Sequence, residues 1–125
     1  MLPSTVFSQD VKVKKDEVLL DGKAFLNYEK LTIVEYSIKD VTGNEFLSLQ
    51  IKESPTTHAS YLVLYFTEAK RRIESTSIDR ISGMGSKTMI EKLITWLLKD
   101  KVLNADGTIN PEKLEVFSEK YNDYK

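Results

Sequence analysis

The sequence contains no cysteine and only one histidine, His58. Without cysteine the chain can form neither a disulfide nor a thiolate zinc site, and it has no thiolate nucleophile. A metal site built from several histidines is excluded, and His58 is the only base that a histidine-based triad could use. His58 lies in the polar segment 54–60, which indicates a solvated loop rather than a catalytic position. We therefore expect no metal and no cofactor.

An excess of charge of one sign and long apolar runs are also missing. The formal net charge is -1, so no global field attracts nucleic acid or an anionic membrane. No segment approaches the roughly 18 consecutive apolar residues of a transmembrane helix. The 125 residues, 41% hydrophobic and 30% charged, have the size and composition of one globular domain, which we place at residues 10–125.

The first nine residues carry no charge, and Val6, Phe7 and Ser8 have the small-x-small form that signal peptidase recognises. No basic region or long apolar region precedes them. Residues 1–9 are therefore expected to be a flexible N-terminus, either the remnant of a signal peptide or a frayed end.

The apolar residues recur with a period of about two up to residue 76, which predicts strands. Strands are expected near 11–13, 18–20 and 23–26, and Asp21-Gly22 between the last two is the signature of a tight hairpin turn.

Residues 32–39 and 47–51 alternate between apolar and polar and predict a second hairpin with one buried face. Segment 61–66 is apolar on both faces, which predicts a strand at the centre of the sheet that is covered on both sides. A last strand is expected at 71–76, although 68–74 also fits a short helix. The short connections favour an antiparallel meander.

The apolar period changes to about 3.6 after residue 76. A first helix is expected over 86–103, begun by a capping box of Thr88 and Glu91 or by Ser86 as the N-cap. Asn110 before a proline predicts the start of a last helix that ends at residue 122. The expected fold is α+β: an antiparallel twisted sheet of about five or six strands packed by two C-terminal helices.

The segment 82–88 resembles a phosphate loop. A P-loop consists of a glycine, four further residues, and then Gly-Lys-Ser/Thr. Here Ile81 stands in place of the first glycine and Ser86 in place of the second. The segment can be interpreted as an anion site at a helix start or as the bend that joins sheet to helix. The candidate ligand-binding residues are Gly85, Ser86, Lys87 and Thr88.

A second segment, 102–109, resembles the middle of a calcium-binding loop around Gly107. Val102 stands where the loop needs its first aspartate, and Lys113 stands where it needs its last glutamate. We interpret this segment as the connection between the two helices.

A basic triplet is the remaining candidate and consists of Lys70, Arg71 and Arg72. Together with the aromatic side chains of segment 61–66 it could bind single-stranded nucleic acid. However, Glu68 and Glu74 flank the triplet, and the aromatic residues are explained by core packing. Nucleic-acid binding is therefore kept only as an alternative.

Several motifs occur together in this chain. They are the lysine-rich strand and Asp-Gly-Lys within residues 11–23, Gly83-x-Gly85, the apolar helix that follows it, and the Asp-Gly-Thr-Ile-Asn-Pro-Glu segment at 106–112. In this combination the chain resembles small, uncharacterised exported proteins of Bacteroidetes-type bacteria. The resemblance implies a signal peptide, a β-rich body and two terminal helices. It also implies an exported location, periplasmic or at the cell envelope, with a cytoplasmic location as the alternative. It implies no activity and no catalytic residues.

These observations lead to a functional hypothesis. We expect a non-enzymatic binding or envelope-associated domain, monomeric or homodimeric, with an unidentified ligand or protein partner. The alternatives are a single-stranded nucleic-acid-binding module that uses Lys70, Arg71 and Arg72, and a phosphate- or nucleotide-binding protein that uses the helix start at 83–88.

Overall fold

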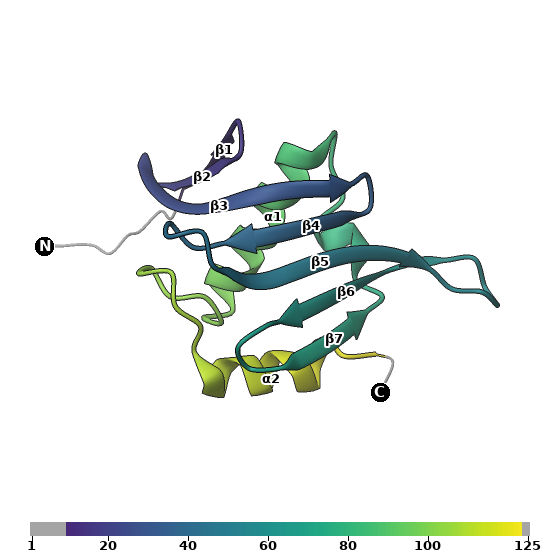
Figure 1. Cartoon of the computed structure of the whole chain (residues 1–125). Coiled ribbons are helices and arrows are strands. Elements are labelled where there is room, and N and C mark those ends of the chain that lie inside the picture. The colour runs from purple at the N-terminus through teal and green to yellow at the C-terminus, as the bar shows by residue number, and fades with distance from the viewer. Residues whose placement is uncertain (1–9, 124–125) are drawn as a thin grey trace, which may run out of the picture.

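The computed structural model describes residues 10–123 as a seven-stranded antiparallel sheet and two helices. Each strand pairs with the next one along the chain, so the order is that of a simple meander (Figure 1). The elements are β1 (Val11–Lys14), β2 (Glu17–Leu20), β3 (Lys23–Thr32), β4 (Glu35–Lys39), β5 (Glu45–Glu53), β6 (Ser60–Phe66), β7 (Arg71–Ser75), η1 (Ile78–Arg80), α1 (Ser86–Lys99) and α2 (Pro111–Tyr121). The predicted α+β class is confirmed, and the sheet has more strands than the five or six expected.

Two sequence predictions concern the N-terminus and the absence of a transmembrane helix. The possible signal-peptide remnant, residues 1–9, lies outside the described residues. Of the helices between residues 10 and 123, neither has the length and hydropathy needed to cross a membrane.

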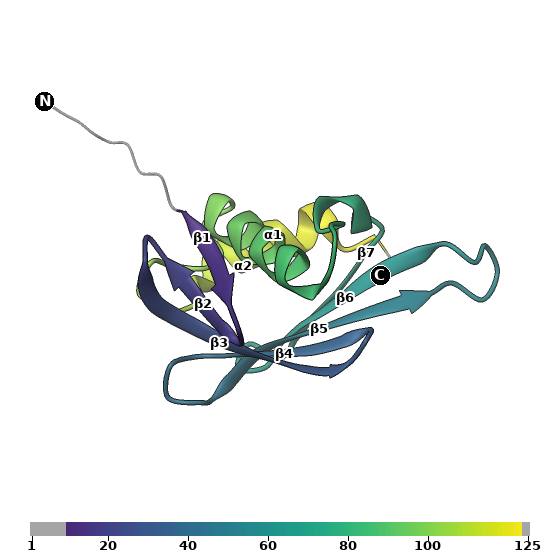
Figure 2. The same ribbon diagram turned by 90° about the horizontal axis from the view of Figure 1, so that it is seen from above.

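Both helices lie on one face of the sheet, which curves around α1 (Figure 2). The pairing explains this arrangement, because alternate residues of each strand form rows across the sheet. Tyr36, Leu49, Leu64 and Ile73 are successive cross-strand partners in one such row, and all are buried. Burial of a leucine or isoleucine side chain stabilises the fold by about 1.5–3 kcal/mol, so rows of this kind supply most of the driving force for packing α1 against the sheet.

The first hairpin forms as the sequence predicts. Asp21 and Gly22 connect β2 to β3 with φ angles of 52° and 84°. Positive φ at both central positions is the geometry of a type I′ turn, whose twist matches that of the paired strands. The second predicted hairpin is also present, with β4 paired to β5.

The expected strand at 32–39 is wrong at its start, because a turn separates β3 from β4 there. β3 ends at Thr32 and β4 begins at Glu35, so Val34 is exposed in the turn rather than buried in a strand. The Thr32 hydroxyl accepts a hydrogen bond from the Val34 N–H at 3.2 Å. A threonine hydroxyl thus closes a turn that has no glycine, proline, asparagine or aspartate to announce it.

The predicted position of segment 61–66 is also wrong. β6 is the sixth of seven strands, and the helices cover only one of its faces. On the other face Tyr61 and Tyr65 are partly exposed, yet Val63 between them is only 2% exposed. Its cross-strand partners are Gln50 and Glu74, whose long side chains share that face. Neighbouring side chains, rather than a second layer, therefore shield the apolar residue. The strand alternative for the following segment is correct, since β7 replaces the possible helix at 68–74.

The apolar stripe of the first helix is confirmed, but its capping is not. α1 begins at Ser86 with Gly85 as its N-cap, and no side chain caps it. The expected capping box is wrong because Thr88 already lies inside the helix, and the Glu91 carboxylate accepts a hydrogen bond from the Val13 N–H of β1.

α1 also ends at Lys99, four residues before the expected end at residue 103. The N–H groups of Lys101 and Val102 donate to the carbonyls of Leu98 and Leu97, at 3.1 and 3.0 Å. This double closure is a Schellman motif, and it places Lys101 at a φ of 63°.

The start of α2 matches the prediction. The Asn110 side chain accepts a hydrogen bond from the Lys113 N–H at 3.1 Å, and Pro111 occupies the first turn. α2 ends at Tyr121, one residue before the expected end.

Candidate functional site

The glycine-rich segment before α1 has structural roles at Gly83, Gly85 and Ser86, whereas Met84 and Lys87 are exposed. Gly85 has a φ of 97°, and the Ser86 hydroxyl forms a hydrogen bond of 3.0 Å with the Tyr36 hydroxyl. A Cβ atom on Gly83 would lie 2.5 Å from the Cγ2 atom of Thr88. These contacts account for the glycines as packing and turn positions.

Lys87 is exposed and forms no ion pair with any residue between 10 and 123. Of the four candidate residues at the helix start, Thr88 contributes to the cleft described below. The anion site at 85–88 stays a prediction.

Two residues of the basic triplet at 70–72 form ion pairs with carboxylates. Arg71 forms an ion pair with Glu115 of α2, and the Arg72 Nε atom lies 2.7 Å from the Glu74 carboxylate. Lys70 lies in the turn before β7 with a φ of 52°. The ion pairs reduce the charge that this edge can offer to a phosphate backbone, and nucleic-acid binding stays a prediction.

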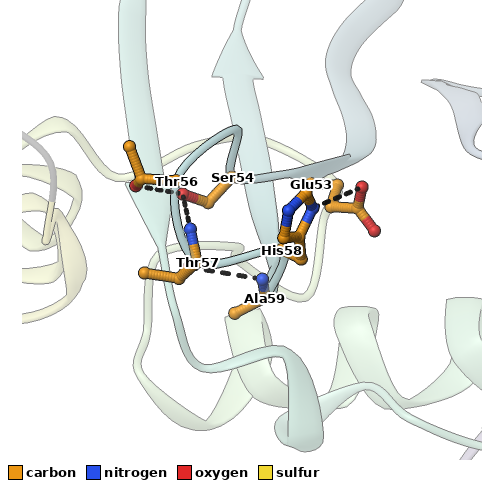
Figure 3. Close-up of polar contacts among 6 residues, drawn as sticks. All are labelled: Glu53, Ser54, Thr56, Thr57, His58 and Ala59. Atoms are coloured by element: carbon orange, nitrogen blue, oxygen red, sulfur yellow. Dashed lines mark hydrogen bonds and ion pairs between the residues drawn. The ribbon is translucent and has the colours of Figure 1, made fainter.

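His58 lies in the polar loop between β5 and β6, as the sequence indicates (Figure 3). Its imidazole is largely exposed, and Nδ1 lies 3.6 Å from the Glu53 carboxylate. The loop hydroxyls serve the loop itself: Ser54 accepts from the Thr57 N–H, and Thr57 accepts from the Ala59 N–H.

In segment 102–109, which resembles a calcium-binding loop, the Asp106 carboxylate forms hydrogen bonds within its own turn. The Asp106 carboxylate accepts hydrogen bonds from the Thr108 hydroxyl and N–H, at 2.6 and 3.0 Å, and these bonds lower its pKa. The Asn104 amide donates to the same hydroxyl at 3.0 Å. In the described part of the chain, no three acidic or histidine side chains group in a way that could hold a metal ion.

A cleft of about 440 Å³ lies beside the outward face of α1, between β1 and η1. Three elements form its walls: β1 supplies Val11, η1 supplies Arg80, and α1 supplies a row of side chains. The row on α1 comprises Thr88, Glu91, Lys92, Thr95, Trp96 and Lys99, and Asp100 follows it. The spacing of three and four residues places this row along one side of the helix.

Cations outnumber carboxylates in this cleft. Arg80, Lys92 and Lys99 line it, and no carboxylate of residues 10–123 forms an ion pair with any of them. Of its two carboxylates, Glu91 accepts a hydrogen bond from the Val13 N–H at 2.8 Å, and Asp100 lies at the C-cap of α1. The Lys92 ammonium group donates to the Ser82 carbonyl.

Trp96 contributes an aromatic surface whose position is fixed by its neighbours. Its ring centroid lies 5.1 Å from that of Phe117 and 4.9 Å from that of Tyr121. The Arg80 guanidinium lies over both Trp96 and Tyr121, at 5.2 and 5.0 Å from the ring centroids. The guanidinium is thus held at the cleft by two cation–π contacts.

The indole of Trp96 has an unused donor. Trp96 is 5% exposed, and its Nε1 atom has no hydrogen-bond partner among the described residues. A buried donor without an acceptor costs about 1–3 kcal/mol.

Sequence reasoning missed this cleft. Polar residues at 88, 92, 95 and 99 follow a helical period, which was a detectable signal, but an exposed helix face has the same pattern. Arg80 gave no signal, because it reaches the cleft through the short η1 turn, whose path depends on the packing of the whole chain.

Comparisons with known proteins give no family for this chain. No protein-family model matches it, and no curated protein and no solved structure is significantly similar to it. The geometry of the cleft is therefore the basis for a functional proposal.

Proposed function

We propose that the protein is a non-enzymatic binding domain whose cleft beside α1 holds a small anionic ligand with a carboxylate or phosphate group. One observation carries this proposal. Arg80, Lys92 and Lys99 come from two separate elements and line one cleft, and none of them forms an ion pair with a described carboxylate. Attraction to these cations favours an anion.

Arg80 is the main recognition residue. Contacts with the Trp96 and Tyr121 rings hold its guanidinium group at the cleft, and its N–H groups can donate to a planar or tetrahedral anion. Because the rings already restrict the side chain, binding costs less conformational entropy than it would for a free arginine.

The apolar residues of the cleft indicate that the ligand also has an apolar group. Val11 and Trp96 line the cleft beside the cations, each with less than a tenth of its surface exposed. The cleft volume lies within the usual range for small-molecule sites, about 300–1,000 Å³. A carboxylate or phosphate attached to a compact apolar group therefore fits this site better than a bare inorganic anion.

The Thr95 hydroxyl of the cleft is used within its own helix, which supports binding rather than turnover at this residue. The Thr95 hydroxyl donates to the Glu91 carbonyl at 2.8 Å, within its own helix. It is therefore not paired with a general base, which is what an activated nucleophile requires.

The proposal is tested by NMR titration with phenyl phosphate and benzoate, following the Trp96 indole N–H and the backbone amides of α1. We expect shifts centred on the cleft, and binding weakened about tenfold in Arg80→Gln and in Lys99→Gln. Lys87→Gln is the matched control, since Lys87 is on the same helix but outside the cleft. The absence of any shift with either probe at millimolar concentration would exclude the site. Loss of binding in Lys87→Gln alone would instead indicate the helix start.

A further inference from the structure

Exposed apolar side chains gather on two loops. Ile33 and Val34 form the turn between β3 and β4, Leu31 lies just before it, and Met84 lies in the loop before α1. Ile33 is 78% exposed and Met84 is 94% exposed. We call Leu31, Ile33, Val34 and Met84 the apolar tip.

The two loops of the apolar tip lie against each other. The Tyr36 hydroxyl donates to the Ile33 carbonyl at 3.3 Å and lies 3.0 Å from the Ser86 hydroxyl. Since the tyrosine proton is used by the carbonyl, Ser86 donates the second bond. One tyrosine thus joins the turn to the start of α1, and Figures 1 and 2 both show these segments side by side.

The loop that carries Met84 is held in place on both sides. The Lys92 ammonium group donates to the Ser82 carbonyl, and Gly83 packs against Thr88. The methionine side chain is therefore presented to solvent by a fixed backbone.

Positive charge surrounds the apolar tip. Lys30 and Lys87 are exposed in the same two segments, and Lys92 reaches the Ser82 carbonyl. Of the nearby carboxylates, Glu29 lies 2.8 Å from the Lys39 ammonium group, and Glu35 accepts a hydrogen bond from the Gln50 amide at 2.8 Å. Three lysines thus face two carboxylates, Glu35 and the exposed Asp79 of η1, that no cation of the described residues neutralises.

We propose that the apolar tip docks on an anionic lipid bilayer. Apolar side chains at the ends of adjacent loops can enter the interfacial region of a membrane, and the lysines around them would contact lipid phosphates. The charge pattern favours this occupant over a second copy of the chain, since a symmetric dimer would bring the same lysines together. The tip also consists of four side chains, whereas a standard protein interface engages about 20–30 residues on each side.

The test is cosedimentation of the full chain with vesicles. One set contains phosphatidylcholine and phosphatidylglycerol in equal amounts, and the other contains phosphatidylcholine alone. We expect binding to the anionic set, a decrease as salt is added, and at least about a tenfold loss of binding in the double variant Ile33→Asp, Met84→Asp. Val41→Asp is the matched control, because Val41 is an exposed apolar residue at the turn between β4 and β5.

A second variant, Lys30→Glu with Lys87→Glu, leaves the apolar residues intact and is expected to lower binding to the anionic set. Absence of the wild-type chain from the anionic pellet would overturn the proposal. Equal binding to both vesicle sets would overturn the assignment to anionic lipid. A concentration-dependent dimer that disappears in Ile33→Asp would overturn it in favour of self-association.

Discussion

The Glu91 carboxylate of α1 accepts a hydrogen bond of 2.8 Å from the main-chain N–H of Val13 in β1. Among residues 10–123, β1 is the first strand of the sheet and pairs only with β2, so this N–H belongs to an open edge of the described sheet. The carboxylate takes the place that the carbonyl of a further strand would occupy. The contact also closes the curve of the sheet around α1 and sets one wall of the cleft.

Removal of this carboxylate should destabilise the fold. We expect Glu91→Ala to lower the free energy of unfolding by about 1–2 kcal/mol, because the hydrogen bond is charge-assisted and partly buried. Glu91→Gln should cost less, since its amide oxygen can still accept from Val13. Urea denaturation measures both. Glu119→Ala, at an exposed position of α2, is the control, and an equal loss in the control would contradict this role.

A change at Gly83 tests whether the glycine serves packing rather than a ligand. Gly83→Ala places a Cβ atom 2.5 Å from Thr88 Cγ2, and we expect a loss of about 1–3 kcal/mol in stability. Thr88→Ser removes that methyl group, so the double variant should recover part of the loss. A double-mutant cycle by denaturation gives the coupling. Strictly additive losses would show that the two side chains do not meet.

The sequence predicts the elements of this fold better than their positions. Alternation identified β4 and β5, and Asn110 before proline identified the start of α2, because these signals depend only on local geometry. The turn after β3 escaped prediction because the Thr32 hydroxyl makes it. The place of β6 escaped because long neighbouring side chains can bury Val63 as well as a second layer can.

The candidate site shows the same limit more strongly. The motif that sequence reasoning selected, 82–88, is accounted for mainly by packing, and of its candidate residues Thr88 reaches the cleft. The Arg80 guanidinium is held in place by Trp96 and Tyr121, which lie on two different helices. A contact among three elements that are separated in sequence leaves no local pattern, so a single sequence could not reveal it.

The end of α1 offers a stabilising substitution. Lys101 adopts a φ of 63°, where the Cβ atom of an ordinary residue costs about 1–2 kcal/mol. Lys101→Gly should raise the free energy of unfolding by about 0.5–1 kcal/mol, after allowance for the greater entropy of glycine in the unfolded chain. Lys101→Ala is the control, because it removes the same side chain but keeps Cβ. Equal stability of the two variants would show that backbone strain is absent.

Asp123 provides a pH-dependent contact with Thr76, the residue that follows the edge strand β7. The Asp123 carboxylate accepts hydrogen bonds from the N–H and the hydroxyl of Thr76, both at 2.8 Å, and they lower its pKa below the usual aspartate value. The contact is therefore complete above the pKa of an unfolded aspartate and is lost as the pH falls through the lowered value.

We expect the Thr76 amide resonance to titrate with a midpoint below that of an ordinary aspartate, and the titration to vanish in Asp123→Asn. The Asn110 amide is the internal control, because it donates to the Val102 carbonyl at 2.8 Å and neither residue titrates. The Glu74 amide, which donates to the Asn122 side chain at 3.0 Å, reports on the neighbouring contact. An NMR pH titration that follows these amides decides the matter, and a Thr76 midpoint at or above the usual aspartate value would contradict the contact. If Glu74 moves together with Thr76, protonation releases residues 122–123 from β7 as one unit, because the Asp123 N–H also donates to the Glu74 carbonyl at 2.8 Å.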